Sequence, residues 1–261
     1  MIMKKAHAVA LLTYLRKTAA FVFLIALLAI TADVLRFVTM IAASPTIGPA
    51  GTSLDRPYEQ DIPGADMRIL IAGDSTAVGV GAYTPKETIA GRLAEDISDA
   101  AIENIAVSGA RVSDVVKQIE SVRGEYDMVL VQVGANDIVL FSNGQEVRDH
   151  AVRMMERALL RSDTVIVAAP FDVSIVPLIP RFIVPLFSLR SADILSTMRE
   201  VVEEKGGIFI DLYKSEEEKQ FAEHADTFFS ADSFHPSSDG YALAYERIKK
   251  ELCERGILCV E

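Results

Sequence analysis

The sequence has no tryptophan, only two cysteines and fewer basic than acidic residues. Its 26 Lys and Arg against 37 Asp and Glu give a net charge of −11, which argues against a nucleic-acid partner because such proteins present a basic face. The absence of tryptophan disfavours a platform for carbohydrate rings. Internal repeats are also lacking, and outside one linker there is no low-complexity segment.

The two cysteines, Cys253 and Cys259, lie close to the carboxyl end. Their spacing matches neither a zinc site nor a C-x-x-C redox motif, so the sequence predicts no metal centre. In an oxidising compartment the pair would close a small loop, with Gly256 allowing the bend. Two free thiols are an equal alternative.

Basic residues are concentrated in the first 44 residues, which hold five Lys or Arg and one acidic residue. There the uncharged segment Thr18–Ala32 follows a basic pair, an arrangement typical of a secretory signal or a membrane anchor. A membrane span would end at Asp33 or continue past it. Because the following small residues fit a cleavage site poorly, we expect residues 1–43 to be an uncleaved anchor rather than a cleaved signal or a buried helix.

This anchor predicts where the rest of the chain lies. Basic residues stay in the cytoplasm, so we expect a single-pass membrane protein with its catalytic domain outside the cytoplasm, or a secreted protein if the leader is cleaved. Residues 44–65 are predicted to be a linker, because Ser44–Gly64 is rich in proline and glycine and shows no periodicity. Residues 66–261 then form one globular domain, long enough to bury a full core.

Short apolar segments alternate with amphipathic ones throughout the globular part. Five segments have the length and boundaries of buried strands: Met67–Ala72, Ala101–Val107, Met128–Val133, Thr164–Ala169 and Gly207–Leu212. Five others carry apolar residues at helical spacing: Thr88–Ile97, Val112–Val122, Glu146–Arg161, Ala192–Lys205 and Tyr241–Cys253. This alternation predicts an α/β domain with a parallel sheet covered on both faces.

Ser75 follows the first predicted strand at a Gly-Asp-Ser break. The apolar run Ile69–Ala72 stops at Gly73 and Asp74, which places Ser75 at the carboxyl end of a strand. In a parallel sheet flanked by helices, ligands bind in the crevice outside these ends, so Ser75 stands where a nucleophile would. The alternatives are a helix cap and a glycine-rich turn that holds a phosphate.

Polar residues also follow the next two predicted strands. Gly109 comes directly after the second strand, where its backbone N–H can face the same crevice, although glycine is also an ordinary turn residue. Asn136 follows the third strand, where its amide can donate to an oxygen held near Ser75. Asp137 would orient this loop or cap the following segment. An Asx turn is the alternative interpretation.

Asp232 and His235 precede the last predicted helix. A serine hydroxyl becomes a good nucleophile when a base takes its proton, and the base works best when a carboxylate fixes its tautomer. Asp232 and His235 meet this need locally, with Pro236 stiffening the exit into the helix, whereas a solvated loop histidine is the alternative. The other histidines lie in the leader, on a charged helix and in an acidic stretch: His7, His150 and His224.

Together, Ser75, Gly109, Asn136 and the D-x-x-H-P sequence at 232–236 resemble the SGNH hydrolases, also called the GDSL esterase and lipase family. The resemblance covers nearly all of the chain outside the leader and the linker. It implies a three-layer α/β/α sandwich around a five-stranded parallel sheet of the flavodoxin-like type. Thr76 stands where the family name has leucine, which bears on subgroup and pocket shape more than on activity.

The same resemblance implies a role for each residue. Ser75 matches the nucleophile, His235 the general base and Asp232 its orienting acid, while Ser75, Gly109 and Asn136 match the oxyanion hole. We therefore expect a serine esterase that acts on carboxylic esters, of lipids or lysophospholipids or with short acyl chains, without a metal ion or cofactor. A deacetylase of O-acetylated envelope polysaccharide and a non-catalytic α/β binding module remain the alternatives.

The segment Phe171–Leu189, between the fourth strand and the next helix, holds three prolines and many large apolar residues. Its prolines exclude a regular helix through its middle. Beside the crevice it would form a lid, an acyl-chain pocket or a membrane contact, and a buried structural loop is an equal alternative. As a lid, it would make replacement of Ile183 and Phe187 by serine more harmful to activity on long acyl esters than on acetyl esters.

Overall fold

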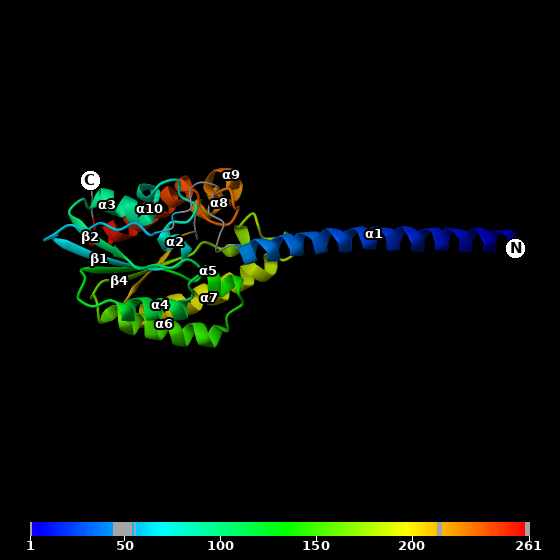
Figure 1. Ribbon diagram of the computed structural model, residues 1–261. Helices are drawn as coiled ribbons and strands as arrows, with labels where there is room; N and C mark the ends of the chain where they lie inside the picture. The colour runs from blue at the N-terminus through cyan, green and yellow to red at the C-terminus, as the bar shows by residue number, and fades with distance from the viewer. Residues whose placement is uncertain (1, 44–53, 55, 213–215, 259–261) are drawn as a thin grey trace. The chain divides into compact units, whose positions relative to one another are not determined.

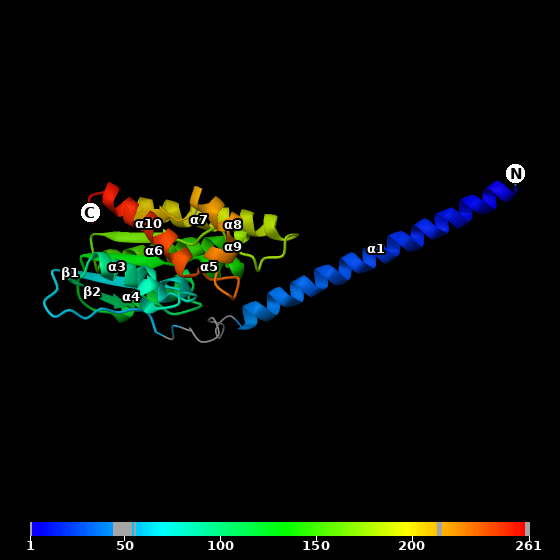
Figure 2. The ribbon, with the colours of Figure 1, turned by 90° about the horizontal axis from the view of Figure 1, so that it is seen from above.

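The computed structural model describes residues 2–43, 54, 56–212 and 216–258. The chain separates into two compact units, residues 1–44 and 45–261 (Figures 1 and 2). The first is a single helix, α1 (Ile2–Ala43), in which Thr13–Leu35 is long and apolar enough to cross a membrane. At 1.5 Å per residue these 23 residues extend about 35 Å, more than the roughly 30 Å hydrocarbon core of a bilayer.

Five parallel strands form the centre of the second unit. They are β1 (Met67–Gly73), β2 (Ala100–Asn104), β3 (Met128–Gln132), β4 (Val165–Ala169) and β5 (Ile208–Asp211). Their order is β2-β1-β3-β4-β5, the flavodoxin-like order, in which ligands bind where the winding reverses beside β1. Ile69 of β1 pairs with Ile102 on one side and Met128 on the other. The predicted five-stranded parallel α/β fold is confirmed.

Helices cover both faces of the sheet (Figure 1). One face carries α3 (Ile89–Asp96) and α10 (Ser238–Glu254), and the other carries α4 (Val112–Ser121), α6 (Gly144–Leu159) and α7 (Val184–Glu204). Contacts join α3 with α10 on the first face, and α4 with α6 and α6 with α7 on the second. The result is three layers, and the chain changes face after β2 and again after β5.

The core lies on both sides of the sheet. Strands β3 and β4 are buried along their whole length, as expected of the central strands of a parallel sheet that helices cover on both faces. Buried side chains of the helices complete the core on each face: Leu93 from α3 and Ile248 from α10 on one, Ile119 from α4 and Met154 from α6 on the other.

Several predicted boundaries differ from the structure by a few residues, and two of these differences have a clear local reason. The helix predicted to begin at Ala192 begins at Val184, because Pro185 lies in the first turn, where its missing N–H breaks no intrahelical hydrogen bond. The second strand ends at Asn104. The side-chain oxygen of Asn104 accepts the N–H of Ala106 at 3.2 Å, which turns the chain out of the ladder.

Several short helices lie in the connections between the main elements. Each has too few residues for a hydrophobic period to be detected in the sequence. Four are α-helices, α2 (Ser75–Val78), α5 (Ala135–Val139), α8 (Glu216–Glu223) and α9 (Ala225–Phe228), and two are 3₁₀ turns, η1 (Pro85–Glu87) and η2 (Val173–Ile175). Of these, α2 and α5 directly follow β1 and β3, so they begin at the edge of the sheet where ligands are expected.

Part of the predicted linker pairs with the edge of the sheet. Gln60 forms an antiparallel bridge with Ile102 of β2, through N–H···O bonds of 3.0 and 2.8 Å. Its side-chain amide also donates to the carbonyl of Ala100 at 2.9 Å. The linker residues 44–53 and 55 lie outside the described residues, as does Cys259, so the disulfide stays a prediction.

Candidate active site

Ser75 lies at the carboxyl end of β1 as the first residue of α2. Asp74 caps this helix, because its Oδ1 accepts the backbone N–H and the hydroxyl of Thr76 at 2.9 and 2.7 Å. Gly73 allows the close approach of β1 to β3, since a Cβ there would lie 2.0 Å from the carbonyl oxygen of Gln132. The Gly-Asp-Ser-Thr sequence therefore sets the position of the Ser75 side chain.

His235 reaches Ser75 from the loop before α10. Its Nε2 lies 3.0 Å from Oγ of Ser75, and its Nδ1 lies 2.6 Å from Oδ2 of Asp232. All three side chains are buried. The structure thus joins Asp232, His235 and Ser75 in one chain of hydrogen bonds, although Ser75 and His235 are 160 residues apart.

The loop that carries Asp232 and His235 is held by its own polar groups. Oδ1 of Asp232 accepts the backbone N–H groups of Phe234 and His235 at 2.8 and 2.9 Å, which fixes the carboxylate against the imidazole. Ser233 has a φ of +59°, an uncommon value for a residue with a side chain, and so turns the loop sharply. Ser237 then caps α10 by accepting an N–H of its first turn at 3.1 Å.

Asp232 is held in its ionised form. Burial raises the pKa of its carboxyl, but hydrogen bonds from His235, the charge of His235 and the backbone N–H groups outweigh burial and lower the pKa below the usual 3.8. An ionised Asp232 accepts the proton on Nδ1 of His235. The lone pair of Nε2 then faces the hydroxyl of Ser75, which is the arrangement a general base needs.

Ser230 also belongs to this site, although no motif in the sequence indicates it. Its hydroxyl donates to Oδ1 of Asp232 at 2.7 Å, and its backbone N–H donates to the carbonyl of His235 at 2.8 Å. The only signal in the sequence is a serine two residues before Asp232, which does not distinguish Ser230 from other loop serines. Its role depends on the folded loop.

Gly109 and Asn136 lie on the loops that flank β1, because β1 is placed between β2 and β3. Gly109 has a φ of +81°, and the space where a Cβ would stand is open. Asn136, the second residue of α5, donates its side-chain amide to the carbonyl of Ala110 at 3.0 Å. The two loops are therefore hydrogen-bonded to each other at the edge of the sheet that carries Ser75.

Asp137 joins the same two segments through a second hydrogen bond. Its Oδ2 accepts the N–H of Val112 at 3.0 Å, so it caps α4, an earlier segment of the chain and not the following one. Burial raises the pKa of Asp137 against the opposing effect of this hydrogen bond. The Asn136–Asp137 pair thus positions the loop after β2.

Asp74 is a second buried carboxyl group beside Ser75. Burial raises its pKa from 3.8 to about 6, although the hydrogen bonds from Thr76 act in the opposite direction. Within the described part of the chain, neither Oδ2 of Asp74 nor Oε1 of Gln132 has a hydrogen-bond partner. The Asp74 carboxyl therefore carries a free energy cost whenever it is ionised.

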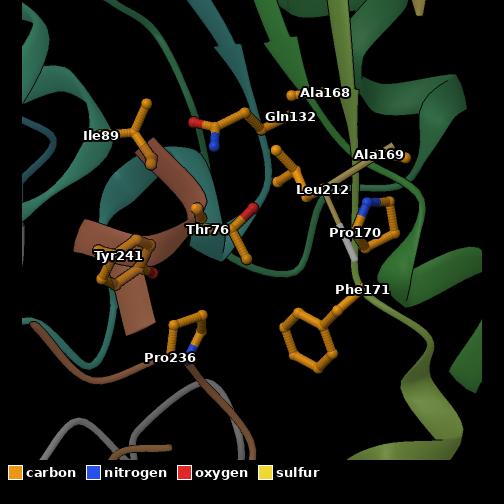
Figure 3. A pocket seen from close by; sticks show the side chains of 11 residues that line it. Thr76, Ile89, Gln132, Ala168, Ala169, Pro170, Phe171, Leu212, Pro236 and Tyr241 are labelled. Atoms are coloured by element: carbon orange, nitrogen blue, oxygen red, sulfur yellow. The ribbon is translucent and has the colours of Figure 1, made fainter. Parts of the chain in front are cut away.

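A small cavity lies beside the site (Figure 3). Thr76 and Pro236, which directly follow Ser75 and His235, form part of its wall together with apolar side chains such as Phe171. Its volume of about 10 Å³ is roughly that needed for one water molecule. The cavity has no room for a long acyl chain unless its walls move.

The described residues contain no group of three His, Cys, Asp or Glu side chains that could hold a metal ion. His150 lies on α6 and His224 directly before α9, and neither belongs to the hydrogen-bonded chain.

Known proteins resemble this chain in sequence and in fold. The chain matches the GDSL-like Lipase/Acylhydrolase family over residues 71–243. The curated GDSL-like esterase Rv1075c of Mycobacterium tuberculosis is 26% identical over 195 residues, which cover 72% of this chain and 62% of that relative. The chain therefore spans less than two thirds of the length of this relative.

Solved structures share the fold. A lipolytic G-D-S-L family protein from Veillonella parvula has a TM-score of 0.59 at 20% identity and covers 72% of this chain and 99% of its own. The psychrotrophic esterase EstA from Pseudoalteromonas sp., in a form inhibited by monoethylphosphonate, has a TM-score of 0.55 at 17% identity and covers 73% and 98%. With the family match extending over most of the sequence, the protein belongs to the GDSL-like lipase/acylhydrolase family, whose members are hydrolases that act on ester bonds.

Proposed function

We propose that this protein is a serine esterase that hydrolyses carboxylic esters through an acyl-enzyme on Ser75. The observation that carries the proposal is the chain of hydrogen bonds from Asp232 through His235 to Ser75. An anion-binding module has no need of an oriented base, whereas activation of a serine hydroxyl requires one. This difference favours catalysis over binding alone.

In the proposed reaction, Nε2 of His235 takes the proton of Ser75 while Oγ forms a bond to the ester carbonyl carbon. The ionised Asp232 stabilises the imidazolium. His235 then gives its proton to the alcohol oxygen as the C–O bond breaks, and the acyl group stays on Ser75. A water molecule that His235 deprotonates then forms a bond to the acyl carbon, and His235 returns this proton to Oγ of Ser75 as the acid is released.

We assign the oxyanion hole to the backbone N–H groups of Ser75 and Gly109 and to the side-chain amide of Asn136. The open space at Gly109 lets a substrate oxygen approach its backbone. The amide of Asn136 has two N–H groups, and because one donates to Ala110, the other can donate to the oxyanion. The carbonyl of Ala110 thereby orients Asn136 before substrate binds, which is the preorganisation that stabilises developing charge.

Two substrate classes follow from different observations. Exposed apolar side chains near the start of α7, such as Leu186 and Leu189, favour a lipid or lysophospholipid ester. The cavity beside Ser75, with space for about one water molecule, favours a short acyl group, as in O-acetylated envelope polysaccharide. The lipid ester is our first candidate and the O-acetyl ester the second.

We further propose that α1 is an uncleaved, single-pass anchor that leaves the α/β domain outside the cytoplasm. The length of Thr13–Leu35 and the basic residues Arg16 and Lys17 before the uncharged segment support this orientation. Protease added to intact cells should digest the domain while α1 stays in the membrane fraction. A domain recovered in the medium would show that the leader is a cleaved signal.

The test of the activity is hydrolysis of p-nitrophenyl acetate, butyrate and palmitate by the full chain, alongside Ser75→Ala and His235→Ala. We expect both variants to lose activity and the wild type to react with a serine-directed fluorophosphonate. Preference for palmitate would select the lipid ester, and preference for acetate the O-acetyl ester. A folded protein with neither ester hydrolysis nor probe labelling would be a binding module.

A further inference from the structure

An apolar patch covers the junction of α5 with the start of α7. Five large apolar side chains there are between 46% and 73% exposed: Leu140, Phe141, Phe182, Leu186 and Leu189. The two elements contact each other (Figure 1). The rings of Phe141 and Phe187 meet edge to face, with their centroids 5.4 Å apart. We call these five residues the apolar patch.

The patch is built rigidly. Phe187, on which Phe141 rests, is fully buried. Phe141 has a φ of +54°, a conformation uncommon for an aromatic residue, and the N–H groups on either side of it, of Leu140 and Ser142, donate to the carbonyls of Asn136 and Asp137. The backbone therefore holds the ring of Phe141 half exposed instead of letting it turn into the core.

The patch lies at the same edge of the sheet as Ser75. Its two segments follow the carboxyl ends of β3 and β4. The N–H of Leu178, in the second segment, donates to the carbonyl of Ser233 at 3.2 Å, which joins this segment to the loop of Asp232 and His235. Whatever surface covers the patch is therefore close to the site.

The charge around the patch differs from that of the rest of the domain. Beyond residue 44 the chain carries 21 Lys and Arg against 36 Asp and Glu, whereas residues 173–192 contain Arg181 and Arg190 and no acidic residue. Arg190 forms an ion pair with Asp193 at 3.3 Å, so Arg181 is the basic side chain that this stretch presents to a partner. An acidic domain is repelled by anionic lipid headgroups, and this repulsion is weaker where a basic side chain lies among apolar ones. The exposed Arg181 beside Phe182 suits an apolar surface bordered by phosphate.

The chain length before the domain identifies the partner. Residues 44–59 precede the bridge from Gln60 to β2 and, at no more than about 3.6 Å each, reach at most about 58 Å, so a bilayer that holds α1 stays within reach of the domain. A single hydrophobic contact gives only marginal membrane binding, and a second contact on the same chain makes it stable. If α1 is anchored, the bilayer stays close enough for even a small exposed apolar patch to bind it.

We propose that the apolar patch docks onto the lipid bilayer and holds the Ser75 site against the membrane surface, where it takes acyl lipids as substrates. This inference rests on the proposed anchor and names the substrate class of the proposed esterase. Leu186 and Leu189 insert between the headgroups, and Arg181 lies at the level of the phosphates.

The absence of tryptophan makes a direct test simple, because any introduced tryptophan is the only one. We would reconstitute full-length Leu186→Trp in phosphatidylcholine vesicles with brominated acyl chains. Leu160→Trp is the matched control, because Leu160 is more exposed than Leu186 (66% against 51%) but follows α6, at the opposite edge of the sheet. We expect emission at shorter wavelength and at least about twofold quenching for Leu186→Trp, and neither effect for Leu160→Trp.

The other outcomes overturn the proposal. Equal quenching of both variants would mean that the bilayer has no preferred contact with the patch. Absence of quenching for Leu186→Trp would place the patch in water. Emission at shorter wavelength without quenching by bromine would assign the patch to a second copy of the chain.

A second measurement separates this proposal from the proposed activity. Quenching of Leu186→Trp should be the same with Ser75→Ala added, so a chain without esterase activity still tests docking. With activity, Leu186→Asp combined with Leu189→Asp should reduce hydrolysis of a long-chain ester in vesicles at least about tenfold and leave p-nitrophenyl acetate hydrolysis unchanged. Leu160→Asp should affect neither substrate. Equal loss on both substrates would contradict docking as the cause.

Discussion

Nε2 of His235 lies 3.0 Å from Oγ of Ser75, although 160 residues separate the two in the sequence. The end of β1 positions Ser75. The loop before α10 positions His235, and Asp232 of the same loop forms a hydrogen bond with Nδ1 of His235. The hydroxyl of Ser230 in turn donates a hydrogen bond to Asp232. Each contact in this chain leads to a measurable expectation.

Asp232→Asn should lower kcat on p-nitrophenyl esters by about 10⁴. The asparagine amide would donate to Nδ1 of His235, which moves the ring proton to Nε2 and removes the base that faces Ser75. Steady-state kinetics together with circular dichroism measure the effect. Retention of more than a tenth of wild-type kcat in a folded variant would remove Asp232 from its proposed role.

Asn136→Ala should lower kcat about 10² to 10³-fold, as expected when one oxyanion donor is lost. The effect should fall on kcat and not on KM, because the oxyanion exists only after attack by Ser75. Asn143→Ala is the matched control. Asn143 caps α6, so its loss should reduce the free energy of unfolding by about 1 kcal/mol and leave kcat unchanged.

Ser230→Ala should weaken the hold on Asp232 without abolishing activity. The hydroxyl donates to a carboxylate that also accepts two backbone N–H groups, so we expect a loss of about 1 to 3 kcal/mol in the free energy of unfolding and a modest fall in kcat. Ser196→Ala, which removes a hydroxyl bonded to a helix carbonyl, provides the comparison. Identical unfolding curves for the two variants would contradict a role for Ser230.

Asp74 should make the stability of the domain depend on pH. Its carboxyl ionises near pH 3.8 in the unfolded chain and at about pH 6 in the fold, so between these values the folded state binds a proton that the unfolded state has released. The stabilisation present below pH 3.8 is lost as the pH rises through 6, by about 3 kcal/mol.

Asp74→Asn tests this dependence, because asparagine keeps an oxygen to cap α2 but has no proton to lose. Urea unfolding at pH 4, 5, 6 and 7 should show the free energy of unfolding of the wild type falling relative to that of the variant. Parallel pH profiles for the two proteins would show that the carboxyl of Asp74 titrates alike in both states.

Substitution should destabilise the domain far more at Phe187 than at Phe182, although the two are only five residues apart. Phe187 is fully buried, so Phe187→Ala should reduce the free energy of unfolding by about 3 to 5 kcal/mol. Phe182 is about half exposed, so Phe182→Ala should change it by no more than about 0.5 kcal/mol. Thermal unfolding of both variants measures the difference. Consequently, serine at Phe187 tests the core and not a lid.

Much of the fold could be predicted because its determinants are local in the chain. The central strands contain continuous apolar runs such as residues 128–131, and the amphipathic helices between them require a covered parallel sheet. The position of Ser75 at a strand end follows from the same run of residues. The pairing of Asp232 with His235 is also local, since three residues separate them.

The elements that the sequence does not predict correctly also have local explanations. The sequence does not predict the start of α7 at Val184, because Pro185 argues against a helix there. Proline is tolerated in the first turn of a helix, although not in its middle. Short elements such as α2 and α5 contain too few residues for a period to be detected. The roles assigned to Gly109 and Asn136 stay predictions.

By itself, the sequence determines the layers, the five strands and the side chains with suitable chemistry, because hydrophobic periodicity and turn residues act over neighbouring positions. Only the tertiary structure decides which of these side chains meet. It brings His235 to Ser75, adds Ser230 behind Asp232, and buries Phe187 while leaving Phe182 and Leu186 exposed. Burial and contact depend on residues distant in the chain, whose approach no local pattern specifies.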